Sequence, residues 1–208
     1  MSDISAEDRY ADPQGPLTRL QFIVDVVFAI AMVAFAITYP MPEVEKTAAD
    51  PLRHLLSEMA LDLVSLALTY AVVAMYWYKH TMQFNYRKRL DTGQVVLQLT
   101  SMFGILLLPL SVWLTLALPD FKLSYVIHNV NLVWLGFFSI IAWNQATRDN
   151  RLVDKDLPAE VVTSVRKAAL LEPTVMVIGI FAALIGPVWW MLSFLLLLAP
   201  ALGGRKEK

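Results

Sequence analysis

The residues of this chain that could do chemistry are ionisable groups inside apolar segments. Asp25 is the clearest case, because it interrupts an apolar run that follows Arg19 and continues to Pro40. A helix of about twenty apolar residues is about 30 Å long, which matches the hydrocarbon core of a bilayer. A carboxylate is costly there, so Asp25 indicates either a transport function or a polar contact that packs helices together.

Other polar residues are expected at the depth of Asp25. Arg19 begins the first apolar segment, and Trp77 and His80 end the second. Gln98 lies in the first turns of the third. Because buried polar groups need partners, we expect Asp25 to accept hydrogen bonds from Trp77 and Gln98. His80 can donate or accept, and it could instead extend to the lipid headgroups, as could Arg19.

The sequence contains no recognisable reactive constellation. It has no cysteine, no zinc-protease motif, no nucleophile elbow and no phosphate-binding loop. Its three histidines, His54, His80 and His128, fall in three different segments. We therefore predict no catalytic residue, no metal site and no cofactor, and we do not expect an enzyme. The formal net charge of -1 gives no field that would attract nucleic acid.

Apolar helices must position these groups. Hydrophobic residues make up 57% of the 208 residues, which is typical of an all-α membrane protein embedded in a lipid bilayer. We predict six transmembrane helices, four of them at residues 19–40, 60–78, 94–118 and 123–143. Two further short helices should lie within residues 168–202, separated by Gly186 and Pro187. This six-helix domain occupies residues 17–203, after a flexible N-terminal segment at 1–16 and before a basic tail at 204–208.

Two connections between these helices are long. Residues 41–59 should contain a short helix that begins at Pro51 and is capped by Asp50. Residues 144–167 form the longest polar connection.

The basic residues predict the orientation of the chain. Of its 17 lysines and arginines, only Lys46, Arg53 and Lys122 fall in segments on the side opposite the N-terminus, which leaves fourteen on the side of the N-terminus. Cytoplasmic segments carry the excess of lysine and arginine. We therefore expect both termini to be cytoplasmic.

The first predicted helix has two different faces. With Ile30 taken as zero and 100° per residue, aliphatic side chains fall within about 60° of it; they are Ile23, Val26, Val27, Val33, Ala34 and Ile37. The opposite side carries Asp25 and the bulky residues Phe28, Met32 and Phe35. If the bulky side packs into the bundle, the aliphatic stripe is left to face lipid, another subunit or a central axis.

The run from Arg19 through Asp25 to Ala29 and Ile30 resembles a known signature. In the prokaryotic relatives of the endosomal and lysosomal potassium channel, an arginine of the first helix is followed by Phe-Ser-Asp and then by Ala-Ile. The resemblance extends over most of the chain, and it includes Trp77, His80, Asp91 with Gln98 seven residues later, Leu107 to Pro109, and the closing hairpin.

This resemblance implies a potassium-permeable cation channel of the inner (plasma) membrane. Its subunit would have six helices and assemble as a homotetramer, with the first helices lining the pore. Ile30 would form a hydrophobic constriction, and Val33, Ala34 and Ile37 would line the same pore. K⁺ would be the permeant ion, without a selectivity filter of backbone carbonyls.

The chain departs from the family signature at its centre. Phe-Ser is replaced by Ile23 and Val24, and a small polar residue that often follows is Val33 here. A more aliphatic pore hydrates less readily, because apolar constrictions close by dewetting. Two other hypotheses therefore stay open. One is a proton-coupled carrier in which Asp25 and His80 exchange protons, and the other is a non-conducting membrane scaffold.

Overall fold

The computed structural model describes residues 15–38 and 50–198, and within this part of the chain every regular element is a helix. The six α-helices are α1 Pro16–Thr38, α2 Pro51–Asn85, α3 Thr92–Ala117, α4 Lys122–Thr147, α5 Ala159–Ile185 and α6 Pro187–Ser193, with the short 3₁₀ helices η2 Arg148–Asn150 and η3 Phe194–Leu198. The predicted all-α class is confirmed. The predicted N-terminal segment and basic tail lie outside the described residues, apart from residues 15 and 16.

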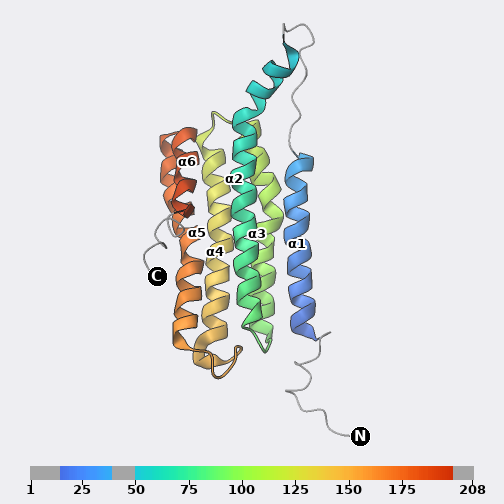
Figure 1. The fold of residues 1–208 in the computed structure, drawn as a ribbon, viewed down its shortest axis with the longest axis vertical. Coiled ribbons are helices and arrows are strands. Elements are labelled where there is room, and N and C mark those ends of the chain that lie inside the picture. Colours follow the sequence, from blue (N-terminus) through green and yellow to red (C-terminus); the bar gives the residue numbers. More distant parts are fainter. Residues whose placement is uncertain (1–14, 39–49, 199–208) are drawn as a thin grey trace, which may run out of the picture.

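The long helices run nearly parallel to one another in a single bundle (Figure 1). The start of α1, the α2–α3 connection and the α4–α5 connection share one end of the bundle. The α3–α4 connection and the turn into α6 lie at the other end. The segments that contain Arg19, His80 and Gln98 therefore approach one another at the same end.

Helices α1, α3, α4 and α5 are each long and apolar enough to cross a membrane, and α2 adds a fifth when the two sides of its bend count as one. Helix α6 has 7 residues and η3 has 5. At about 1.5 and 2.0 Å per residue these two cover about 20 Å, less than the hydrocarbon core. The structure thus shows a multi-pass helical protein whose sixth helix is shorter than a full span.

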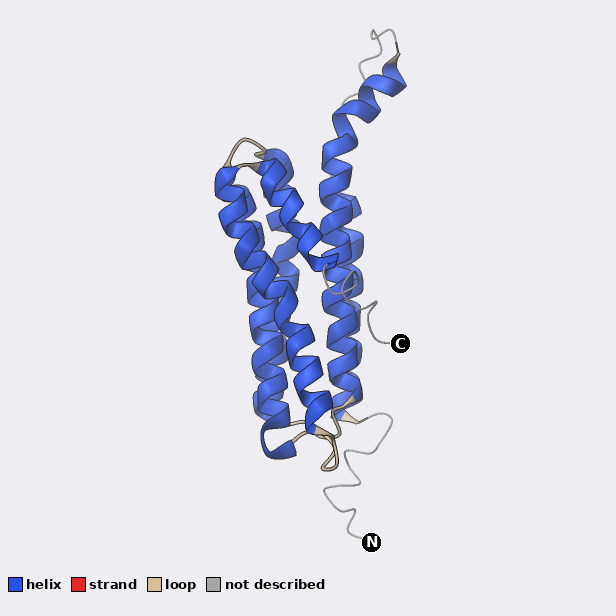
Figure 2. Cartoon of the chain, turned by 60° about the vertical axis from the view of Figure 1, so that its left-hand side comes forward, coloured by secondary structure: helices blue, strands red, loops and turns tan. Residues whose placement is uncertain are grey.

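Several helix boundaries differ from the predictions. Asp50 does cap a helix at Pro51, accepting from the Arg53 N–H at 3.1 Å. This helix is not separate, however: it is the first part of α2, which bends by 47° and then continues (Figure 2). Helix α2 also runs on to Asn85, and α5 begins at Ala159, inside the predicted polar connection. Backbone hydrogen bonding does not stop where a segment ceases to be apolar, so hydropathy underestimated both helices.

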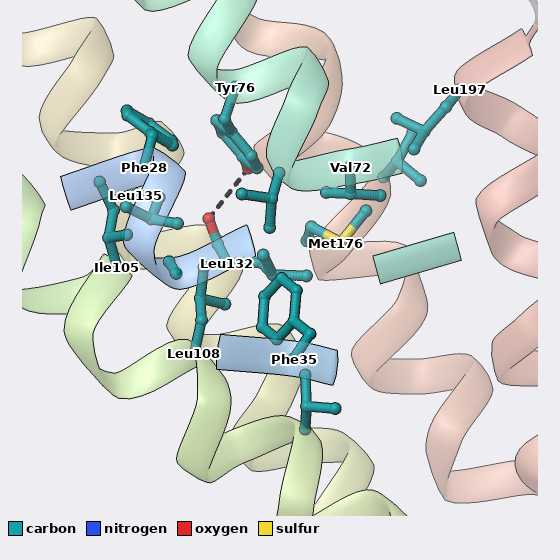
Figure 3. Packing of buried hydrophobic residues seen from close by; sticks show 14 of the residues in the cluster. Phe28, Phe35, Val72, Tyr76, Ile105, Leu108, Leu132, Leu135, Met176 and Leu197 are labelled. Atoms are coloured by element: carbon teal, nitrogen blue, oxygen red, sulfur yellow. Dashed lines mark hydrogen bonds between the residues drawn. The ribbon is translucent and has the colours of Figure 1, made fainter. Parts of the chain in front are cut away.

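The bundle core lies between α4 and its neighbours. Figure 3 shows buried side chains of α2, α3, α4 and α5 meeting there, with the Tyr76 hydroxyl donating to the carbonyl of Leu132 at 2.9 Å. Helices α4 and α5 come especially close where Gly136 faces Pro173, because a Cβ on Gly136 would lie 2.7 Å from the proline ring. Close approach of small residues is a usual way to pack membrane helices.

Helix α1 lies at one edge of the bundle, against α3 and α2 (Figure 1). Its bulky side is buried there, with Val24, Phe28 and Phe35 each 3% exposed or less. Only one side of α1 is therefore covered by the rest of the subunit.

The two connections at the end of the bundle that includes the start of α1 are packed together. Leu152 and Val153 are buried against Trp143, and the N–H groups of Lys88 and Arg89 donate to the Leu152 carbonyl at 2.9 and 3.2 Å. The α4–α5 connection thus covers the α2–α3 connection and shields Arg87, which is 3% exposed.

Candidate functional site: the exposed face of α1 and the polar layer behind it

The aliphatic stripe of α1 is left uncovered by the subunit. Ile30 is 61% exposed, Val33 60% and Ile37 76%, whereas Ala34 is partly buried at the edge of the stripe. Phe22 is exposed on the same side and widens it at the start of the helix. The stripe thus lies opposite the face that packs on α2 and α3.

Asp25 is held from behind this stripe by α2. The indole Nε1 of Trp77 donates to Oδ1 of Asp25 at 2.9 Å. The carboxylate is half-buried at the contact between α1 and α2. This one bond supplies the polar partner that a carboxylate at this depth requires.

Gln98 and His80 form a second contact, between α3 and α2. The hydrogen-bonding pattern assigns the Gln98 amide the orientation in which its nitrogen donates to His80 Nε2 at 3.2 Å and its oxygen accepts from Arg87 at 2.8 and 3.1 Å, so both ends of the amide have partners. The His80 ring is 6% exposed and lies between the tilted rings of Phe28 and Phe84. Gln98 therefore contacts His80 and Arg87 and makes no bond to Asp25 among the contacts of the described residues.

The polar layer behind α1 consists of Asp25, Trp77, His80 and Gln98 and also includes Arg87, which the sequence analysis missed. Its guanidinium lies 4.5 Å from the centre of the Phe84 ring and donates to Gln98. Burial lowers the pKa of Arg87 to about 9, so the group is still charged at neutral pH. It lies in the basic run at residues 87–89, where no local pattern marks it as buried.

Glu172 is a second residue that the sequence analysis missed. It lies on α5, is 1% exposed and forms an ion pair with Lys79 of α2. Lys79 also donates to the carbonyl of Ala168, one turn before Glu172 on α5. A signal was present, because Glu172 is an acid inside a predicted transmembrane block, the same argument that singled out Asp25.

Arg19 does not join these contacts. Its side chain is exposed, and its backbone N–H donates to the Gly15 carbonyl at 3.1 Å. Among the described residues its guanidinium makes no hydrogen bond or ion pair. His80 and Asp25 likewise share no bond there, because His80 pairs with Gln98 and Asp25 with Trp77.

A separate polar cluster is buried toward the opposite end of the bundle. His128 Nδ1 and the Ser111 hydroxyl are 3.0 Å apart, and Trp190 Nε1 donates to the Asn129 side-chain oxygen at 3.2 Å. These bonds join α3 to α4 and α4 to α6. His128 and Asn129 both lie near the start of the fourth predicted helix.

The fold and these polar contacts define a multi-pass helical membrane protein in which the aliphatic face of α1 is left open. A family model described as the endosomal/lysosomal potassium channel TMEM175 matches residues 19–109, which run from α1 into α3. The resemblance predicted from the α1 signature is thereby confirmed over this stretch. A comparison with curated proteins found no match.

Two solved structures share the fold. One is a lysosomal potassium-selective channel TMEM175 homologue from Chamaesiphon minutus, with 16% identity, a TM-score of 0.73, and coverage of 92% of this chain and 98% of that chain. The other is a variant of the potassium channel MtTMEM175 in complex with a nanobody–MBP fusion, with 19% identity, a TM-score of 0.59, and coverage of 87% of both chains. Both chains are covered almost completely, so the likeness extends beyond the part that the family model matches.

Proposed function

We propose that this chain is the subunit of a potassium-permeable cation channel, assembled as a homotetramer with α1 from each subunit around the pore. The family match and the two channels that share its fold support this function. The observation that carries it is the uncovered stripe of α1, which is smooth and aliphatic from Ile23 to Ile37.

In this arrangement Ile30 is the narrowest point of the pore. Val33 and Ile37 continue the apolar wall, and Ala34 lies where that wall meets the neighbouring helix. The pore then has no backbone-carbonyl filter, and it conducts when its apolar constriction is wetted. Asp25 lies behind the wall, so its charge does not line the ion path.

The bonds behind α1 have a defined task in this channel. Trp77 fixes the acid side of α1 to α2, and the buried residues Phe28 and Phe35 fix its bulky side to the bundle. Together they set which face of α1 turns to the shared axis. A small rotation of α1 would change the residues at the constriction.

The orientation follows from the same proposal. The bundle end with the α2–α3 and α4–α5 connections carries most of the lysines and arginines and faces the cytoplasm. We propose that the protein lies in the plasma membrane with both termini cytoplasmic. In a six-crossing topology α6 and η3 contribute to the last crossing.

The test compares Ile30→Asn with Leu106→Asn in reconstituted vesicles. Leu106 on α3 is 63% exposed, close to the 61% of Ile30, so both variants place the same amide on an open apolar surface. We expect K⁺ flux to change strongly in the Ile30 variant, because an amide hydrates the constriction, and to stay unchanged in the Leu106 variant. Equal flux in wild type and both variants would argue against α1 as the pore wall.

Absence of flux in all three proteins would favour the non-conducting scaffold. An image of the detergent-solubilised particle then gives a second readout, because the proposal requires four-fold symmetry with α1 at the axis. Particles without that axis, or with α1 at the periphery, would contradict the proposed assembly.

The proton-coupled carrier is less well supported. It requires Asp25 and His80 to exchange a proton, and the two side chains bond to different partners, Trp77 and Gln98. Flux that depends on a pH gradient and disappears in Asp25→Asn would revive it.

A further inference from the structure

One turn of α2 contacts three other helices through adjacent side chains. Trp77 donates to Asp25 of α1, and Lys79 pairs with Glu172 of α5. His80 accepts from Gln98 of α3. Successive residues of a helix point about 100° apart, which is why this short run can reach three directions.

The contact with α5 is the one of the three that pairs a cation with a buried carboxylate. Glu172 is 1% exposed and the Lys79 side chain 20%. Lys79 also donates to the Ala168 carbonyl, one turn before Glu172 on the same helix. Removing one member of such a pair leaves the other charge buried without compensation.

The pair is not needed to bring α5 to the bundle. Helix α5 already packs closely on α4, where Gly136 meets Pro173, and its contact with α2 is much smaller. Because α4 already holds α5 in place, the Lys79–Glu172 ion pair at this small contact restricts the position of α2 relative to α5. The constrained turn is the one that carries Trp77, the partner of the pore helix.

We infer that Glu172 is a positioning residue of the channel: by holding Lys79 it fixes the turn of α2 through which Trp77 holds Asp25, and so sets the rotation of α1. The inference rests on the proposed function for its effect on conduction. Through Glu172, α5 then influences the pore wall that α1 forms.

The test is a double-mutant cycle of Glu172→Gln and Asp25→Asn, with K⁺ flux as the first readout. Each single variant is expected to change flux about fivefold or more, within the usual range of coupling between sites. If Glu172 acts through Asp25, the double variant should behave as Asp25→Asn alone, because the second change has no further bond to disturb. Glu160→Gln, at an exposed position on the same helix, is the matched control and should leave flux unchanged.

A second readout does not require conduction. The chain has no cysteine, so Ile30→Cys introduces a single thiol on the open face of α1. The rate at which a water-soluble maleimide modifies it should change with Glu172→Gln and Asp25→Asn, again without an additional effect in combination. If wild-type vesicles carry no flux, the proposed function fails, and the labelling cycle still decides this inference.

Two results would overturn the inference: wild-type flux and labelling in an assembled Glu172→Gln protein, or effects that simply multiply with those of Asp25→Asn. Should Glu172→Gln fail to assemble, the neutral pair Lys79→Met with Glu172→Leu replaces it, because apolar residues of similar volume usually substitute for a buried ion pair without loss of folding. Assembly with altered labelling of the Ile30→Cys thiol supports the inference. Labelling at the wild-type rate, or failure of this pair to assemble, would show that the contact only stabilises the fold.

Discussion

Trp77 Nε1 donates to Asp25 Oδ1 at 2.9 Å, and this bond ties α1, whose aliphatic stripe is uncovered, to the rest of the subunit. It joins residues 52 positions apart in the sequence. The carboxylate is satisfied from the bundle side, so the opposite face of α1 contains only apolar side chains from Ile23 onward. The polar bond and the apolar stripe are two consequences of one helix orientation.

Replacing Trp77 with Phe removes the donor and keeps an aromatic ring. We expect a loss of about 1 kcal/mol of stability, less than for a fully buried hydrogen bond to a charged group, because the contact is partly exposed. Thermal unfolding of the assembled protein in detergent measures it. Trp113→Phe is the control, since Trp113 is similarly exposed, at 44% against 39%, and donates no hydrogen bond in the described structure. Equal shifts in the two variants would contradict a special role for the Trp77 bond.

Two substitutions of Gln98 should differ in how strongly they destabilise the protein. Gln98→Leu leaves the buried Arg87 guanidinium without its acceptor and is expected to cost about 2 kcal/mol or more. Gln98→Glu keeps an acceptor and adds a counter-charge, so it should retain the fold much better. The yield and thermal stability of the assembled protein compare the two. If both variants are equally stable, Arg87 does not depend on Gln98.

The close approach of α4 and α5 can be tested with glycine substitutions. Gly136→Ala places a methyl group 2.7 Å from Pro173, and forcing the helices apart is expected to cost about 1–3 kcal/mol. Gly186→Ala is the control, because no atom lies within 4 Å of a Cβ there and the backbone is extended with a φ of 169°. A stable Gly136→Ala protein would show that α4 and α5 can separate at no cost.

The properties that depend on local pattern were predictable. Apolar runs of bilayer length located the long helices, and Gly186 with Pro187 located the break before α6, because both signals act within a few residues. The two faces of α1 follow from helical periodicity alone, since the bulky residues needed a core to pack against. Asp25 and Trp77 were expected at one depth because each lies at the same end of its own apolar segment.

What the sequence by itself determined, therefore, was the helical membrane class, the open face of α1 and the need of Asp25 for a partner, because these depend on hydrophobicity and helix geometry along one segment. Tertiary structure alone decided the partners. It joined Gln98 to Arg87, and it paired Lys79 with Glu172. Such choices depend on how helices distant in sequence rotate and pack against each other, and no single segment contains that information.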